Sequence, residues 1–92
     1  MQKRRITKTA PASVKEALQR VYEGLPEQAS FGDRVRSFRN ARLMTQESLA
    51  AAAGVSRSAV AQWESDLAVP SRDNRQAASK ALKVPPSWLM PG

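Results

Sequence analysis

The sequence predicts an all-α protein built of short helices, and three observations support this. Helix-start patterns recur, because Ser13 stands three residues before Glu16 and Ser30 three residues before Asp33, a spacing typical of capping boxes. Apolar residues follow them at three- and four-residue intervals, which places them on one face of a helix. The stretch 45–64, TQESLAAAAGVSRSAVAQWE, contains two further helix starts separated by a glycine.

The composition predicts one small domain with an anionic partner. Of the 92 residues, fifteen are basic and eight acidic, so the formal charge is +7. The excess is spread along the chain, with +3 in residues 1–30 and +4 in residues 31–92. Such a charge suits nucleic acid or an acidic membrane surface.

Several functional classes are disfavoured by what the chain lacks. It has no cysteine and no histidine, which excludes disulfides and the usual zinc ligands and removes the commonest general base. We therefore predict no metal, no cofactor and no enzymatic activity. No apolar run approaches the roughly 20 residues that span a bilayer, and the basic start is not followed by the apolar core of a signal peptide. We expect a soluble, cytoplasmic chain with no membrane partner.

The N-terminal part divides into a tail and a helix. Residues 1–10 are basic with almost nothing apolar, so we expect a flexible tail, either simply solvated or acting as an arm along phosphates or into a groove. In residues 11–29 we predict an amphipathic helix followed by a short linker. Gly24 and Pro26 end the helix. The helix must pack on its own domain, which we favour slightly, or on a second copy. Its apolar stripe consists of Val14, Ala17, Leu18, Val21, Tyr22 and Leu25.

Residues 30–92 form the main predicted domain. Its first helix starts at Ser30 and has an apolar face, and Arg34 is among the arginines that line the rest of this helix. In the central stretch, Thr45 and Ser56 are N-caps and Gly54 ends the first of two helices. Across the second of these helices, Val60 and Trp63 face the core, which leaves Arg57, Ser58, Ala61 and Gln62 pointing outward.

The central stretch resembles the helix-turn-helix family of the phage lambda repressor and Cro, also called the XRE family. A glutamine at the start, then Leu-Ala, Gly-Val-Ser, Val and Trp-Glu all stand in its register, and the resemblance runs from about Phe31 to the C-terminus. It implies five helices over residues 30–92, to which the N-terminal helix adds a sixth. The fourth of the five starts at Ser71, and a last helical turn over residues 84–90 puts Trp88 and Leu89 on the core.

The resemblance also implies roles for individual side chains. A recognition helix at about Arg57–Ser65 enters the DNA major groove, where each base pair shows a distinct pattern of donors and acceptors. Base contacts are carried over to Arg57, Ser58 and Gln62. Arg39 and Glu64 form a structural ion pair that joins two helices. The phosphate contacts are expected from Gln46, Arg36, Arg42, Ser71 and Arg72, with Arg75 as a further candidate.

The sequence departs from the family pattern in two places. Asp66 stands where glycine is expected after Trp-Glu-Ser, although aspartate tolerates a left-handed conformation, and the usually basic loop that follows is Leu67-Ala68-Val69. We hypothesise that the basic N-terminus compensates for weaker phosphate binding by this loop. Leu43 replaces the glycine that commonly ends the first helix, so that boundary is uncertain.

The leading functional hypothesis is a nucleoid-associated transcriptional regulator that binds double-stranded DNA. We expect a repressor of bacterial or phage origin that binds a palindromic operator as a homodimer, with either the C-terminal residues 88–90 or the N-terminal stripe at the dimer surface. The alternative is an antitoxin that neutralises a small partner toxin and represses its own operon. An antirepressor is another possible small protein partner. An enzyme ranks third because no catalytic constellation is visible.

Overall fold

Five α-helices and one short 3-10 helix make up the part of the chain that the structure describes. The computed structural model describes residues 13–91, and over this range it contains no strand. The elements are α1 (Val14–Gly24), α2 (Phe31–Ala41), α3 (Gln46–Ala53), α4 (Arg57–Glu64), α5 (Arg72–Leu82) and the 3-10 helix η2 (Pro86–Leu89). The predicted all-α class is confirmed, and the last turn is a 3-10 helix. The prediction for residues 1–10 lies outside the described residues.

The helix starts follow from local side-chain chemistry. Ser13, Ser30, Thr45, Ser56 and Ser71 each have extended backbone, and each side chain accepts a hydrogen bond from the amide three residues later. These bonds satisfy amides that have no partner inside the helix. The predicted N-caps are therefore confirmed.

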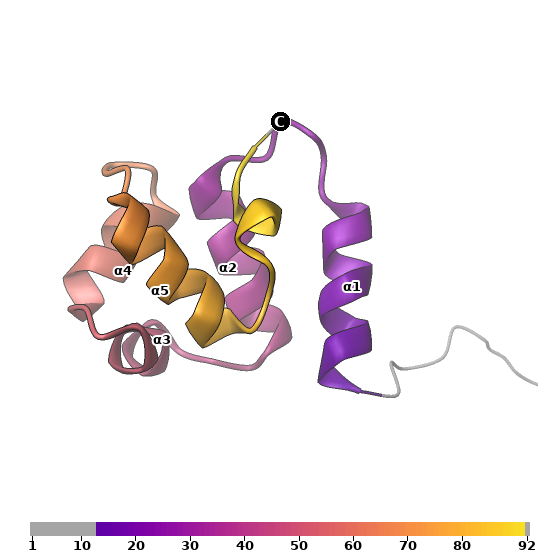
Figure 1. The fold of residues 1–92 in the computed structure, drawn as a ribbon, viewed down its shortest axis with the longest axis horizontal. Helices are drawn as coiled ribbons and strands as arrows, with labels where there is room; N and C mark the ends of the chain where they lie inside the picture. Colours follow the sequence, from indigo (N-terminus) through magenta and orange to yellow (C-terminus); the bar gives the residue numbers. More distant parts are fainter. Residues whose placement is uncertain (1–12, 92) are drawn as a thin grey trace, which may run out of the picture.

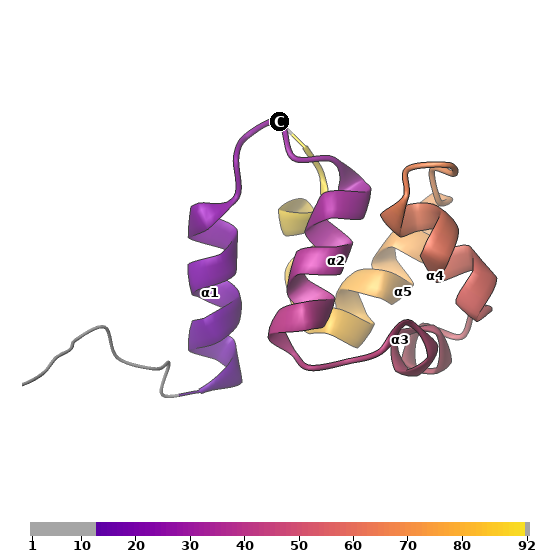
Figure 2. The same ribbon diagram turned by 180° about the vertical axis from the view of Figure 1, so that it is seen from behind.

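The helices are arranged around α2. Figures 1 and 2 show α1 on one side of α2 and the group α3, α4 and α5 on the other. Side chains from all the helices meet in one apolar core, with Phe38 of α2 fully buried. The other buried side chains of this core are Leu18, Val35, Leu49, Ala50, Val60, Trp63, Ala78, Leu82, Val84 and Leu89.

Helix α1 packs on its own domain. Leu18 is buried in the core, and the Tyr22 ring stacks on Trp88 with centroids 4.4 Å apart and planes 6° from parallel. Trp88 also stacks on Phe38 at 5.9 Å, so an aromatic layer joins α1, η2 and α2. The apolar stripe, for which the sequence left two packing partners open, is thus mostly used within the chain. No helix within residues 13–91 is long and apolar enough to cross a membrane.

Arg34 was predicted to lie with the other arginines of α2 away from the apolar face of the helix, and the structure corrects this. Its side chain is buried, with 5% of the residue exposed. The guanidinium donates to the carbonyls of Ala29 at 2.9 Å, Glu27 at 3.0 Å and Trp88 at 3.2 Å. It therefore joins the linker after α1 to the C-terminal 3-10 helix. The apolar periodicity of α2 could not reveal this role, because the acceptors are carbonyls of other segments.

Leu43, which follows α2, has a strained backbone and no packing to compensate. Its φ is +57° and it is 93% exposed, so the side chain stabilises nothing. A left-handed conformation costs a leucine about 1–2 kcal/mol, whereas glycine adopts it freely at a smaller cost in unfolded-state entropy. We expect Leu43→Gly to raise the free energy of unfolding by about 0.5–1 kcal/mol in urea denaturation. Leu43→Ala keeps the strained φ and is the control; an equal gain in Leu43→Ala would contradict the explanation.

Candidate nucleic-acid interface

The turn between α3 and α4 holds the two helices in a fixed relation. Gly54 has φ +73°, a left-handed conformation that glycine adopts at little cost. The amide of Val55 then donates to the Ala50 carbonyl at 3.0 Å, closing the end of α3. On the core side, Val60 and Trp63 of α4 are buried, and Trp63 meets Phe31 edge-to-face at 6.1 Å. Helix α4 is thus anchored along one face only.

The opposite face of α4 carries the predicted base-reading side chains. Arg57, Ser58 and Gln62 are exposed, and their side chains make no hydrogen bond or ion pair within the described residues. Ser56 caps the helix directly before Arg57, so the positive end of the helix dipole lies next to Arg57 and Ser58. The structure therefore brings these three residues together on a rigid, unpartnered polar face.

Behind this face lies a network around one buried carboxylate. Glu64 is 4% exposed, and its two oxygens lie 2.5 Å from Arg39 Nε and 3.0 Å from Arg39 Nη2. Arg39 also donates to the Met44 carbonyl at 2.9 Å, and Gln46 Nε2 donates to Glu64 Oε1 at 3.1 Å. The network joins α2, α3 and the end of α4, and it orients Gln46 at the start of α3.

The side chains expected at phosphates fall into two groups. Arg36 donates to Asp33 Oδ1 at 2.9 Å and to the Glu64 carbonyl at 3.1 Å, and Arg42 donates to the Leu82 carbonyl at 3.3 Å. These two guanidiniums thus already bind groups within the chain. Arg72, by contrast, is exposed at the start of α5, and the exposed Ser71 uses its hydroxyl oxygen to accept from the Asn74 amide at 3.2 Å. Their roles at phosphate stay predictions.

Asp66 has a role that the sequence did not reveal. Its φ is +59°, and its carboxylate accepts hydrogen bonds from Ser30 Oγ at 2.8 Å and from the Gly32 amide at 3.1 Å. The side chain thereby caps α2 and ties it to the chain leaving α4. A signal was present in the replacement of an expected glycine by aspartate, but the partners lie 36 and 34 residues away.

Two short helices joined by a glycine turn, with the second presenting a free polar face, define a helix-turn-helix protein. The helix-turn-helix family model matches residues 35–89, so the chain belongs to this family, in its lambda repressor and Cro type. Among known proteins, it is 38% identical over 61 residues to the repressor protein C2 of Salmonella phage P22. It is also 38% identical over 63 residues to the transcriptional regulator DicA of Escherichia coli K12.

Coverage differs between the chain and these relatives. The matched segments cover 66% and 68% of this chain but only 28% of C2 and 47% of DicA. The chain therefore corresponds to less than half the length of either relative.

Solved structures give the same family assignment. The solution structure of the P22 c2 repressor DNA-binding domain superposes with a TM-score of 0.66 at 35% identity, covering 67% of this chain and 82% of that one. The restriction-modification controller protein C.AhdI of Aeromonas hydrophila superposes with a TM-score of 0.65 at 33% identity, and the match covers 70% of this chain and 97% of that one. The P22 c2 repressor bound to a synthetic operator superposes with a TM-score of 0.64 at 36% identity, and the match covers 66% of this chain and 92% of that one.

Proposed function

We propose that this protein binds double-stranded DNA sequence-specifically in the cytoplasm and represses transcription as a homodimer on a palindromic operator. The observation that carries the proposal is the free polar face of α4, where Arg57, Ser58 and Gln62 project from a helix whose other face is buried. Similarity to the P22 c2 repressor, which has been solved with a synthetic operator, supports the same conclusion.

The chemistry of that face suits the major groove. Arg57 can offer two parallel donors to guanine O6 and N7, and Gln62 can both donate to and accept from adenine. Ser58 can bond to several bases. Gln46 uses one amide hydrogen on Glu64 and keeps a second for phosphate, which Ser71 and Arg72 would also contact at the start of α5.

A homodimer follows from how little one such helix can read. A single recognition helix covers about four to five base pairs, and two copies on an inverted repeat multiply the specificity. Repression by occupying a site needs no catalytic group, which agrees with a family of DNA-binding regulators. The antitoxin alternative relied on the apolar stripe of α1 as its partner-binding segment. Since Leu18 is buried in the core and Tyr22 stacks on Trp88, the packing of α1 does not favour that alternative.

Selection of bound duplexes from a random DNA pool tests the proposal. At about 150 mM salt, where nonspecific binding is suppressed, we expect an enriched inverted repeat with half-sites about one helical turn apart. If no duplex is enriched, the proposed function is wrong.

Substitutions on α4 test which atoms read the sequence. We expect Arg57→Ala or Gln62→Ala to cost about 1–3 kcal/mol on the enriched duplex and little on random DNA, because each removes a base contact. Binding would be measured by fluorescence anisotropy on both duplexes. Arg20→Ala on α1 is the matched control for lost charge, since α1 lies at the other end of the molecule (Figure 1). Equal losses on both duplexes would show that the two side chains contact only phosphate.

A further inference from the structure

The segment directly after the recognition helix is an exposed apolar loop, Leu67–Val69. Leu67 is 79% exposed and Val69 86%, and no side chain of this apolar loop carries a charge or a hydrogen-bond donor. Large apolar side chains so exposed next to each other are typical of an interaction site when they form part of a contiguous patch.

The apolar loop is held in place at both ends. At its start, the Leu67 amide donates to the Gln62 carbonyl at 2.9 Å, and the Asp66 carboxylate is bonded to the start of α2. At its end, Pro70 is buried and its carbonyl accepts from Arg75 Nη1 at 3.2 Å. The apolar side chains are therefore presented to solvent by an anchored backbone, which lowers the entropy cost of docking.

We propose that the apolar loop is the contact between two copies of this chain bound to adjacent half-sites, an inference that rests on the proposed function. Two recognition helices on successive major grooves lie roughly 34 Å apart, so the two-fold axis runs roughly 17 Å from each α4, and the surfaces that meet there must lie on the neighbouring parts of the chain. The apolar loop satisfies this condition because it leaves the last turn of α4. An isologous contact then places Leu67 and Val69 of one copy against the same residues of the other.

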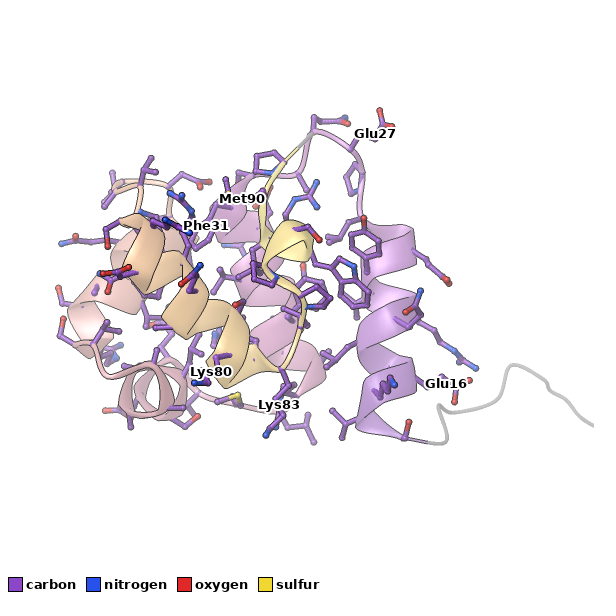
Figure 3. All side chains as sticks on the ribbon, in the orientation of Figure 1. Glu16, Glu27, Phe31, Lys80, Lys83 and Met90 are labelled. Carbon is purple, nitrogen blue, oxygen red and sulfur yellow. The ribbon has the colours of Figure 1, made fainter. Side chains whose placement is uncertain are left out.

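The other apolar surfaces fit a second copy less well. Helix α1 lies at the end of the molecule opposite α4 in both views (Figures 1 and 2), so pairing through α1 would hold the two recognition helices far apart. Met90 borders a depression of about 210 Å³ that Arg72 and Arg75 also line, and two copies meeting there would bring like charges together. The far end of α5 carries Lys80 and Lys83 (Figure 3). In a chain of charge +7, the uncharged loop is where two copies meet at least electrostatic cost.

The size of the apolar loop sets the strength of the contact. A stable interface buries roughly 800 Å² per partner, far more than two side chains can supply. The contact is therefore weak between free chains, and it acts on DNA, where two neighbouring half-sites raise the effective concentration of one copy for the other. The main effect of the contact is that two copies bind the neighbouring half-sites cooperatively.

The test compares Leu67→Ser/Val69→Ser with the unaltered protein on two probes, the inverted repeat enriched from the random pool and a duplex that retains one half-site. The unaltered protein is expected to fill the repeat cooperatively. The double variant should lose this cooperativity, with affinity for the repeat falling by about tenfold or more, while affinity for the single half-site stays unchanged. Leu43→Ser is the matched control, because this leucine is even more exposed than Leu67 and Val69 but follows α2, and it should leave both affinities unchanged.

A loss of single half-site affinity in the double variant would overturn the proposal, since it would place the apolar loop on DNA. Unchanged cooperativity would overturn it too. Sedimentation equilibrium of the free chains up to about 1 mM, a range that resolves weak association, provides a test without DNA: self-association must occur and must weaken in the double variant. If single half-sites are bound but self-association is absent, the contact is wrong and the proposed function stands.

Discussion

Replacing Arg39 by methionine is expected to lower the free energy of unfolding by about 3–5 kcal/mol, because it leaves a buried carboxylate without its cation. Glu64 is almost fully buried and lies 2.5 Å and 3.0 Å from the two guanidinium nitrogens. The Gln46 amide, at 3.1 Å, can only partly replace that charge. A domain of this size has a stability of roughly 5–14 kcal/mol, so the loss is a large share. The midpoint of urea denaturation measures it.

The control for Arg39→Met is an exposed ion pair. Arg20 and Glu16 of α1 lie 3.2 Å apart with both side chains more than 40% exposed, so Arg20→Met should cost less than about 1 kcal/mol. Adding Glu64→Leu to Arg39→Met should recover part of the loss, since the unpaired charge is then removed. A loss in Arg39→Met no larger than that in Arg20→Met would show that the buried pair does not stabilise the fold.

Gly32→Ala is expected to destabilise the protein by about 3 kcal/mol, the upper part of the range for overpacking a tight site. A Cβ at this position would lie 2.2 Å from the Trp63 carbonyl oxygen and 2.9 Å from that of Glu64. Both atoms are backbone of α4 and cannot move as a flexible side chain can. The substitution must therefore push α2 and α4 apart and strain the hydrogen bond from the Gly32 amide to Asp66.

Gly24→Ala is the matched control, because nothing lies within 4 Å of a Cβ at that position. Alanine in the last turn of α1 should instead stabilise the helix by up to about 1 kcal/mol. Urea denaturation of both variants separates a steric effect from a general effect of adding a methyl group. Equal small changes at both glycines would contradict the close approach of α2 and α4.

Arg39→Met and Gly32→Ala both act on the contact between α2 and α4, the proposed recognition helix. Arg39 and Gly32 belong to α2, and their partners are Glu64 and the backbone at the end of α4. Binding to the enriched duplex should therefore weaken in variants that still fold, even though neither residue reaches the free face of α4.

Much of the local structure is determined by the sequence alone. The bonds of the N-caps Ser13, Ser30, Thr45, Ser56 and Ser71 join residues three apart, so neighbouring sequence suffices to start each helix. Helical spacing likewise separates the buried face of α4 from its exposed one. The polar face of the candidate site is therefore predictable from residue spacing, with the family pattern supplying the roles of its side chains.

Other features are decided only by the tertiary structure. Arg34 was expected away from the apolar face of α2, but it is buried and donates to the Trp88 carbonyl, 54 residues away. Asp66 was expected only to tolerate the left-handed backbone of an expected glycine, but its side chain also caps α2 through Ser30, 36 residues away. The apolar stripe of α1 had two possible packing partners, and the stacking of Tyr22 on Trp88 decides for its own domain. The physical reason is the same in each case, because the partner of each side chain belongs to a segment that is distant in the sequence and is brought to it only by the fold.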